Sequence, residues 1–190
     1  MNKNQLRKRF LEQRKQLSLK RLQQISQAIS QNFLDGFELT KIKKLHIFLP
    51  ILKQNEINTW FIIKEIFQNY PQIKLVTSKS DFQTRNMESY LLDTHTQIIE
   101  NRWGIPEPIN AIKCREEEID MILIPLLCFD QQGFRVGYGK GFYDRFLSKC
   151  QKEIIKIGLS PFEPVEKITD INDNDLKMDF CIMKERIWKR

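Results

Sequence analysis

Residues 121–147, MILIPLLCFDQQGFRVGYGKGFYDRFL, decide the fold. They open with an unbroken apolar run over 121–127, which predicts a strand that is covered on both faces. Pro125 indicates where the regular hydrogen-bond ladder of this strand ends. A glycine-rich passage leads into a helix expected over 141–150, because apolar residues recur there at helical spacing: Tyr143, Phe146, Leu147 and Cys150. Such a strand–loop–helix unit is typical of an α/β protein.

The rest of the chain repeats this alternation in both directions. The patterns predict four more strands and three more helices: strands 44–49, 73–77, 154–159 and 180–183, a helix over 59–69, and two N-terminal helices, the second capped by Ser18 and ended by Asp35-Gly36. Residues 78–100 show no clear pattern, and 102–108 is typical of a turn-rich connector. We therefore expect an α/β fold with a single three-layer domain over 1–190. Its mostly parallel central sheet is flanked by helices.

Composition excludes several classes of protein. The chain has 190 residues, of which 41% are hydrophobic, as in an ordinary soluble domain. The longest apolar run, over 121–129, is too short to cross a bilayer. The charged first ten residues lack the apolar stretch of a signal peptide, so we expect a cytoplasmic protein. The four cysteines form no Cys-x-x-Cys pair and the two histidines are far apart, which disfavours a disulfide framework or a zinc site.

The positive charge of the chain is confined to its N-terminus. The net charge is +7, from 31 basic and 24 acidic residues. Residues 1–21 alone supply this excess, with Glu12 as their one acid and eight basic residues: Lys3, Arg7, Lys8, Arg9, Arg14, Lys15, Lys20 and Arg21. The other 169 residues carry 23 charges of each sign and are neutral. Such an arm could bind nucleic acid, but it could equally contact a compact polyanion such as a nucleoside triphosphate.

Four of the seven glycines lie between 133 and 141. Alternating glycines allow a ligand to approach the backbone amides, which suit phosphate oxygens. Arg135 and Lys140 add full positive charges, and Asp144 could either complement the helix dipole or bind Mg²⁺. The spacing is neither a Walker A loop nor a dinucleotide fingerprint. The glycines could also serve only a tight turn from strand to helix.

The passage from Pro125 to Arg145 resembles the signature of the 5-formyltetrahydrofolate cyclo-ligase family. The matching pattern is Pro-x-x-x-Phe-Asp-x-x-Gly-x-Arg-x-Gly-x-Gly-x-Gly-x-Tyr-Asp-Arg. Weaker matches extend over nearly the whole chain: the Lys-x-x-Leu-Arg element at 3–7, Glu-x-x-Thr at 56–59, Trp-x-Ile-Pro-x-Pro at 103–108 and the late Asp element at 174–179.

The resemblance implies an enzyme of one-carbon metabolism. Members convert 5-formyltetrahydrofolate to 5,10-methenyltetrahydrofolate and release ADP and phosphate, with ATP as co-substrate and Mg²⁺ required. The formyl oxygen is phosphorylated, and ring closure then expels phosphate. The resemblance also implies a monomer with a small-molecule substrate and with neither a nucleic acid nor a membrane as partner.

The resemblance further implies four sets of site residues. The catalytic set is Lys140, Arg135 and Arg145. The ATP set is Lys3, Asn4, Gln5, Leu6, Arg7, Arg135, Val136, Gly137, Tyr138, Gly139, Lys140, Gly141, Phe142 and Tyr143. The folate set is Ile51, Glu56, Trp103, Tyr138, Gly139, Lys140, Gly141 and Phe142. The Mg²⁺ ligands are Asp144 and Asp175.

Several of these residues have a purely structural alternative. Arg145 could be an ion-pair partner on a helix surface, Glu56 an exposed loop acid, and Trp103 a packing residue. Tyr143 could belong to the core, and we expect His46 to be structural. Two other functions also remain open at this point. One is RNA or DNA binding by the basic arm, and the other is a related α/β enzyme that binds a sugar phosphate or a nucleotide.

Overall fold

The apolar run over 121–127 supplies a central strand, β7 (Met121–Pro125), of an eight-stranded sheet. The computed structural model describes all 190 residues. The sheet order is β12-β11-β10-β7-β1-β2-β3-β6. The other seven strands are β1 (Lys44–His46), β2 (Lys74–Asp81), β3 (Asn86–Leu92), β6 (Lys113–Cys114), β10 (Ile155–Leu159), β11 (Phe180–Ile182) and β12 (Ile187–Lys189).

The strands at the centre of the sheet are parallel, and those at its edges are antiparallel. β1 pairs in parallel with β2 and β7, and β10 pairs in parallel with β7 and β11. β3, β6 and β12 add antiparallel pairs at the two edges. The central strand β7 is apolar and buried on both faces from Met121 to Ile124, as in a sheet covered by helices. The prediction of a mostly parallel α/β sheet is confirmed.

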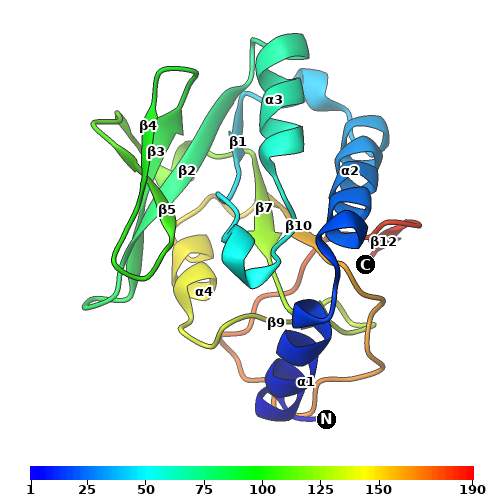
Figure 1. Cartoon of the computed structure of the whole chain (residues 1–190). Helices are drawn as coiled ribbons and strands as arrows, with labels where there is room; N and C mark the ends of the chain where they lie inside the picture. Colours follow the sequence, from blue (N-terminus) through cyan, green and yellow to red (C-terminus); the bar gives the residue numbers. More distant parts are fainter.

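Helices cover both faces of the sheet, which makes three layers (Figure 1). The helices are α1 (Lys3–Lys15), α2 (Leu19–Gly36), α3 (Trp60–Asn69) and α4 (Phe142–Leu147). α2 and α3 pack with Leu123 in one core cluster, whereas Phe146 of α4 packs with Ile122 and Ile124 on the opposite face. The alternating side chains of β7 therefore bind the two layers together.

The N-terminal helix α1 packs apart from the main core, against the hairpin of β8 (Cys128–Phe129) and β9 (Arg135–Val136). Leu6 and Phe10 bury its apolar face against Leu127 and Val136. Asn2 begins the helix with a reciprocal capping box to Gln5. This packing places the start of the chain beside the glycine-rich passage, which follows β9 directly.

Some predicted boundaries were wrong. Strand 44–49 ends at 46, strand 180–183 at 182, and helix 141–150 covers only 142–147, whereas β7 ends at Pro125 as predicted. Strand 73–77 extends to Asp81 and turns back as β3, a hairpin that the sequence pattern did not define. The expected connector at 102–108 contains part of β5 (Pro106–Ile109), which pairs with β4 (Gln97–Glu100). Short 3-10 turns complete the chain: η1 (Leu39–Lys41), η2 (Leu52–Gln54) and η3 (Glu116–Glu118).

None of the helices combines the length and the apolar character that crossing a membrane requires.

Candidate active site

A cavity of about 1020 Å³ opens where β1 and β7 end. In open α/β sheets, ligands bind outside the carboxyl ends of the parallel strands. The lining comes from these strand ends and from β2, the residues after β9, α1 and a late loop around Asp175. Its volume is at the upper end of the range for small-molecule sites.

The glycine-rich loop and α1 approach each other closely at this cavity. Gly139 has a φ of +86°, and a Cβ there would lie 2.9 Å from the Arg7 guanidinium. The Nε of Arg7 donates to the carbonyl oxygen of Gly137 at 3.0 Å. Gly141, with a φ of +67°, turns the chain into α4. The sequence therefore needs glycine at 139 and 141 for backbone conformation, and at 139 also to admit Arg7.

Five basic side chains line the cavity. We call four of them the basic wall, Lys3, Arg7, Arg135 and Lys140, and the fifth is Arg145. Lys3 pairs with Asp175 at 2.5 Å, and Arg135 pairs with Asp144 at 2.6 Å. Arg135 also donates to the Leu176 carbonyl oxygen at 2.7 Å. Lys140 makes no ion pair within the protein. Its ammonium group is therefore available to a ligand.

The two predicted metal ligands, Asp144 and Asp175, both line the cavity. Asp144 uses one carboxylate oxygen for Arg135, and Asp175 uses one for Lys3 and the Asn172 amide. The second oxygen of each carboxylate accepts no hydrogen bond from the protein. Mg²⁺ commonly takes one or two carboxylates and completes its shell with water and phosphate oxygens. The residues present therefore fit a Mg²⁺ ion that arrives with a phosphorylated ligand.

Arg145 donates hydrogen bonds to backbone carbonyl groups and does not form a surface ion pair. Its Nε donates to the Arg85 carbonyl oxygen at 2.8 Å, and its Nη2 donates to that of Lys140 at 2.6 Å. Arg85 lies in the turn between β2 and β3. Arg145 therefore ties the glycine-rich loop to the β2–β3 hairpin, so its geometry is that of a positioning residue.

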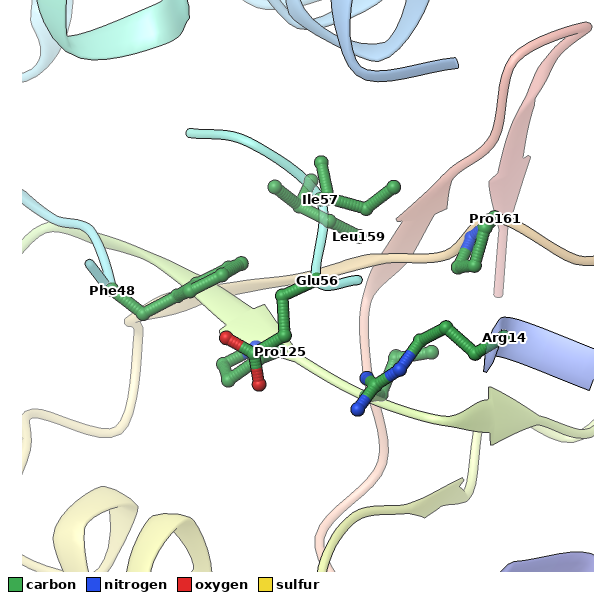
Figure 2. Close-up of a pocket in the computed structure, with 8 residues that line it drawn as sticks. Arg14, Phe48, Glu56, Ile57, Pro125, Leu159 and Pro161 are labelled. Carbon is green, nitrogen blue, oxygen red and sulfur yellow. The ribbon is translucent and has the colours of Figure 1, made fainter. Parts of the chain in front are cut away.

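Glu56 is a buried carboxylate at the cavity, only 3% exposed. Its Oε2 accepts the Ile51 amide at 2.8 Å, and its Oε1 accepts the Tyr138 hydroxyl at 2.6 Å. Burial raises the pKa of Glu56, while the hydrogen bonds from Tyr138 and Ile51 and the charge of Arg14 oppose that rise. The alternative of an exposed loop acid is therefore wrong. Figure 2 shows the Glu56 carboxylate among the residues that line a small pocket adjoining the cavity.

Three aromatic side chains form a second part of the lining, the aromatic wall: Phe82, Trp103 and Phe142. Phe82 and Trp103 stack with their ring centroids 3.9 Å apart, and Phe142 meets Phe82 edge-on at 5.2 Å. Trp103 is 44% exposed, so its ring is not simply a core residue. Tyr143 fits both of its alternatives, because it lines the cavity and also packs against the core.

Three residues of the predicted ATP set do not line the cavity: Asn4, Gln5 and Leu6. Asn4 accepts a hydrogen bond from Arg7 at 2.6 Å, Gln5 caps α1, and Leu6 is 1% exposed in a core cluster. On a helix, only one side can face the loop, and Lys3 and Arg7 occupy that side. These three residues are therefore placed to support the basic wall. All other predicted site residues line the cavity.

The sequence analysis missed other lining residues. Phe82 lies in the stretch that showed no pattern, so no signal pointed to it. His46 was expected to be structural, yet it lines the cavity beside Ser78, with its Nε2 2.5 Å from the Ser78 hydroxyl oxygen. Burial lowers the pKa of His46 to about 3, so its ring is neutral, and its Nδ1 has no partner. The pairing of β1 with β2 brings His46 and Ser78 together, and the sequence of neither segment alone indicates this contact.

Comparison with known proteins agrees with the geometry. The sequence profile of the 5-formyltetrahydrofolate cyclo-ligase family matches residues 1–183. This chain belongs to that family. The enzyme class predicted from the glycine-rich signature is thereby confirmed.

Full-length relatives and solved structures support the same assignment. A 5-formyltetrahydrofolate cyclo-ligase of Mycoplasma genitalium is 28% identical over 184 residues, covering 95% of this chain and 98% of the relative. The structure of the 5,10-methenyltetrahydrofolate synthetase of Aquifex aeolicus superposes with a TM-score of 0.84 at 25% identity, covering 100% of this chain and 93% of the other. The corresponding Mycoplasma pneumoniae structure gives 0.75 at 28% identity, covering 97% and 99%. The family fold therefore extends over the whole of this cyclo-ligase chain.

Proposed function

We propose that this chain converts 5-formyltetrahydrofolate to 5,10-methenyltetrahydrofolate, using ATP and Mg²⁺ and releasing ADP and phosphate. One observation carries the proposal: a single cavity joins a glycine-rich loop with four basic side chains to a buried carboxylate and stacked aromatic rings. The first group suits a triphosphate, and the second suits a flat, hydrogen-bonding heterocycle. An enzyme that couples a nucleotide to a pterin needs both in one place.

The chemistry requires little covalent help from the protein. The formyl oxygen attacks the terminal phosphorus of ATP, the bond to ADP breaks, and an imidate-like phosphate forms. The neighbouring folate N–H nitrogen then attacks the activated carbon, the carbon–oxygen bond breaks to close the ring, and the proton of that nitrogen leaves with the phosphate. Positioning and charge neutralisation at the transferring phosphoryl group account for most of the catalysis in such reactions.

The basic wall performs that neutralisation. Lys140, which has no partner in the protein, reaches the transferring group, while Lys3 and Arg7 of α1 hold the rest of the triphosphate. Arg135 is 7% exposed and anchored to Asp144, so it contributes a fixed charge. Asp144 and Asp175 would hold Mg²⁺, which supplies further positive charge to the phosphate oxygens. Arg145 holds the Lys140 backbone in place.

The other lining residues recognise the folate. The Glu56 carboxylate accepts hydrogen bonds from the amide and amino edge of the pterin. The Phe82–Trp103 stack, with Arg102 over the Trp103 ring at 4.0 Å, adds aromatic surface beside the ring system.

The decisive experiment follows methenyl product by absorbance, with purified protein and 5-formyltetrahydrofolate. Product should form only when ATP and Mg²⁺ are both present, with one ADP released per turnover. Absence of product under these conditions would overturn the proposal. The alternative function, a related α/β enzyme that binds a sugar phosphate, is tested by equilibrium binding of sugar phosphates. We expect sugar phosphates not to compete with the folate for the cavity.

A further inference from the structure

Arg14 is a buried charge that the proposed reaction does not use. It lies near the end of α1, is 3% exposed, and does not line the large cavity. It lines instead a small adjoining pocket of about 10 Å³, which it shares with Glu56. In Figure 2 the Arg14 guanidinium and the Glu56 carboxylate extend toward this pocket from separate segments. Arg14 therefore lies outside the large cavity, on a small pocket that Glu56 also lines.

A directed chain of hydrogen bonds joins the two groups through Tyr138. The Nη2 of Arg14 donates to the Tyr138 hydroxyl oxygen at 2.5 Å, and that hydroxyl donates to Glu56 Oε1 at 2.6 Å. A guanidinium only donates and a tyrosine hydroxyl has a single proton. The direction of the chain is therefore fixed, and it ends on Glu56, whose other carboxylate oxygen accepts the Ile51 amide.

The buried guanidinium depends on this chain for its own stability. The Nε of Arg14 has no partner in the structure, and no carboxylate lies within ion-pair distance of the group. A buried charge with so few hydrogen bonds is costly unless an opposite charge is close by. Glu56, one hydroxyl away, is the negative group that lowers this cost.

The backbone near Arg14 is tied to the loop that carries Glu56. Asn55 donates from its Nδ2 to the Arg14 carbonyl oxygen at 3.0 Å and to that of Leu17 at 3.2 Å. The same helix presents Lys3 and Arg7 to the cavity at its other end. α1 therefore contacts both groups of lining residues as one rigid element.

We propose that Arg14 is a positioning residue for folate recognition, which acts through the Tyr138 hydroxyl to keep Glu56 ionised and aimed at the cavity. This inference rests on the proposed function, since it assigns Glu56 to the folate. It adds a role for the C-terminal half of α1 that is separate from the triphosphate contacts of its first turns.

The charged groups around Glu56 determine the direction in which its pKa changes when Arg14 is replaced. The titratable or charged groups that face it are Arg14 from α1, Tyr138 from the glycine-rich loop and Tyr143 from α4. Arg14 alone supplies positive charge, and it opposes the rise in the pKa of Glu56 that burial causes. Loss of this charge raises that pKa further, so the carboxyl group takes up its proton at a higher pH.

The test compares Arg14→Met with Lys8→Met, which removes one exposed positive charge from the same helix. With kinetics measured across the acidic and neutral range, Arg14→Met should raise the KM for the folate about tenfold and leave the KM for ATP within about twofold. The acid limb of its kcat/KM profile should move up by about one pH unit. Lys8→Met should follow the wild type. An unshifted acid limb in Arg14→Met would overturn the inference.

Tyr138→Phe provides a second, independent measurement. It removes the connecting hydroxyl, so the double variant with Arg14→Met should be no worse than the worse single variant, whereas additive effects would count against the chain. The Glu56 carboxyl pKa, followed by carbon-13 NMR, should also rise in Tyr138→Phe. The pKa of Glu56 in Tyr138→Phe tests the inference even if Arg14→Met does not fold. An inactive wild type would refute the proposed function, whereas an active wild type with an unmoved Glu56 pKa refutes this inference alone.

Discussion

The basic wall of the cavity takes two charges from each of two short segments, α1 and the glycine-rich loop, whereas each residue of the aromatic wall comes from a different segment. Arg135 and Lys140 are five residues apart in sequence. Phe82 and Trp103 come from the β2–β3 hairpin and the β4–β5 connection, and they meet Phe142 only in the folded protein. The two walls therefore differ in how local their construction is.

This difference predicts distinct kinetic consequences. A charge that stabilises the transferring phosphoryl group acts mainly in the transition state, so its loss lowers kcat. A surface that holds a flat ring acts on the bound substrate and in the transition state alike, so its loss raises KM. Substitutions in the two walls should separate along these lines.

The largest effect is expected at Lys140. We expect Lys140→Ala to lower kcat by roughly 10³-fold, because it removes a cation of the basic wall that forms no ion pair within the protein. Steady-state absorbance kinetics measure this. Lys152→Ala, at an exposed lysine outside the cavity, should behave as wild type. A Lys140→Ala enzyme with a normal kcat would remove the functional distinction between the walls.

A smaller effect is expected at Asp144. Asp144→Asn should lower activity by roughly 100-fold and raise the Mg²⁺ concentration needed for half-maximal rate, because one of the two carboxylates that fit the metal loses its charge. Magnesium titrations of the rate measure this. Glu153→Gln, an exposed acid elsewhere, is the matched control. Reduced activity with an unchanged magnesium requirement would instead assign Asp144 only to anchoring Arg135.

The central fold was predictable because its signals are local. The apolar run of β7 and the helical spacing of Leu22, Ile25, Ile29 and Phe33 in α2 report burial directly. The β2–β3 hairpin was not predictable, because its strands alternate only weakly and its edge position leaves many polar residues. Its pairing register, from Leu75 opposite Leu92 to Asp81 opposite Asn86, becomes clear only in the structure.

The candidate site divides in the same way. The glycine spacing predicted the loop that carries Arg135 and Lys140. In the structure, glycine is needed at 139 because the Arg7 guanidinium comes close to the backbone there. Lys3, Arg7 and Arg14 recur at spacings of four and seven residues, which places them near one side of a helix, but that spacing does not indicate their different partners. The contact between Tyr138 and Glu56 spans 82 residues, and only folding brings the two together.

A substitution of Glu56 tests whether the folate-binding part of the cavity acts separately from the basic wall. We expect Glu56→Gln to raise the KM for the folate about thirtyfold with little change in the KM for ATP, because a hydrogen bond to a charged acceptor is lost on the folate side only. Kinetics with each substrate varied separately measure this. Glu100→Gln, in an exposed ion pair with Lys53, is the control and should be silent. Equal changes in both KM values would place the carboxylate between the two ligands.

The smallest effect is expected at Trp103, and it tests the aromatic wall alone. Trp103→Ala should raise the KM for the folate about fivefold and leave kcat nearly unchanged, because a stacking surface contributes about 1 kcal/mol to both bound states. Trp60→Ala, at a similarly exposed tryptophan on α3, controls for loss of an indole ring. Because Trp103 is 44% exposed, the thermal midpoint should fall by only a few degrees. A fall in kcat comparable to that of Lys140→Ala would mean that the stack positions the formyl group for phosphoryl transfer, and the two walls would then act as one.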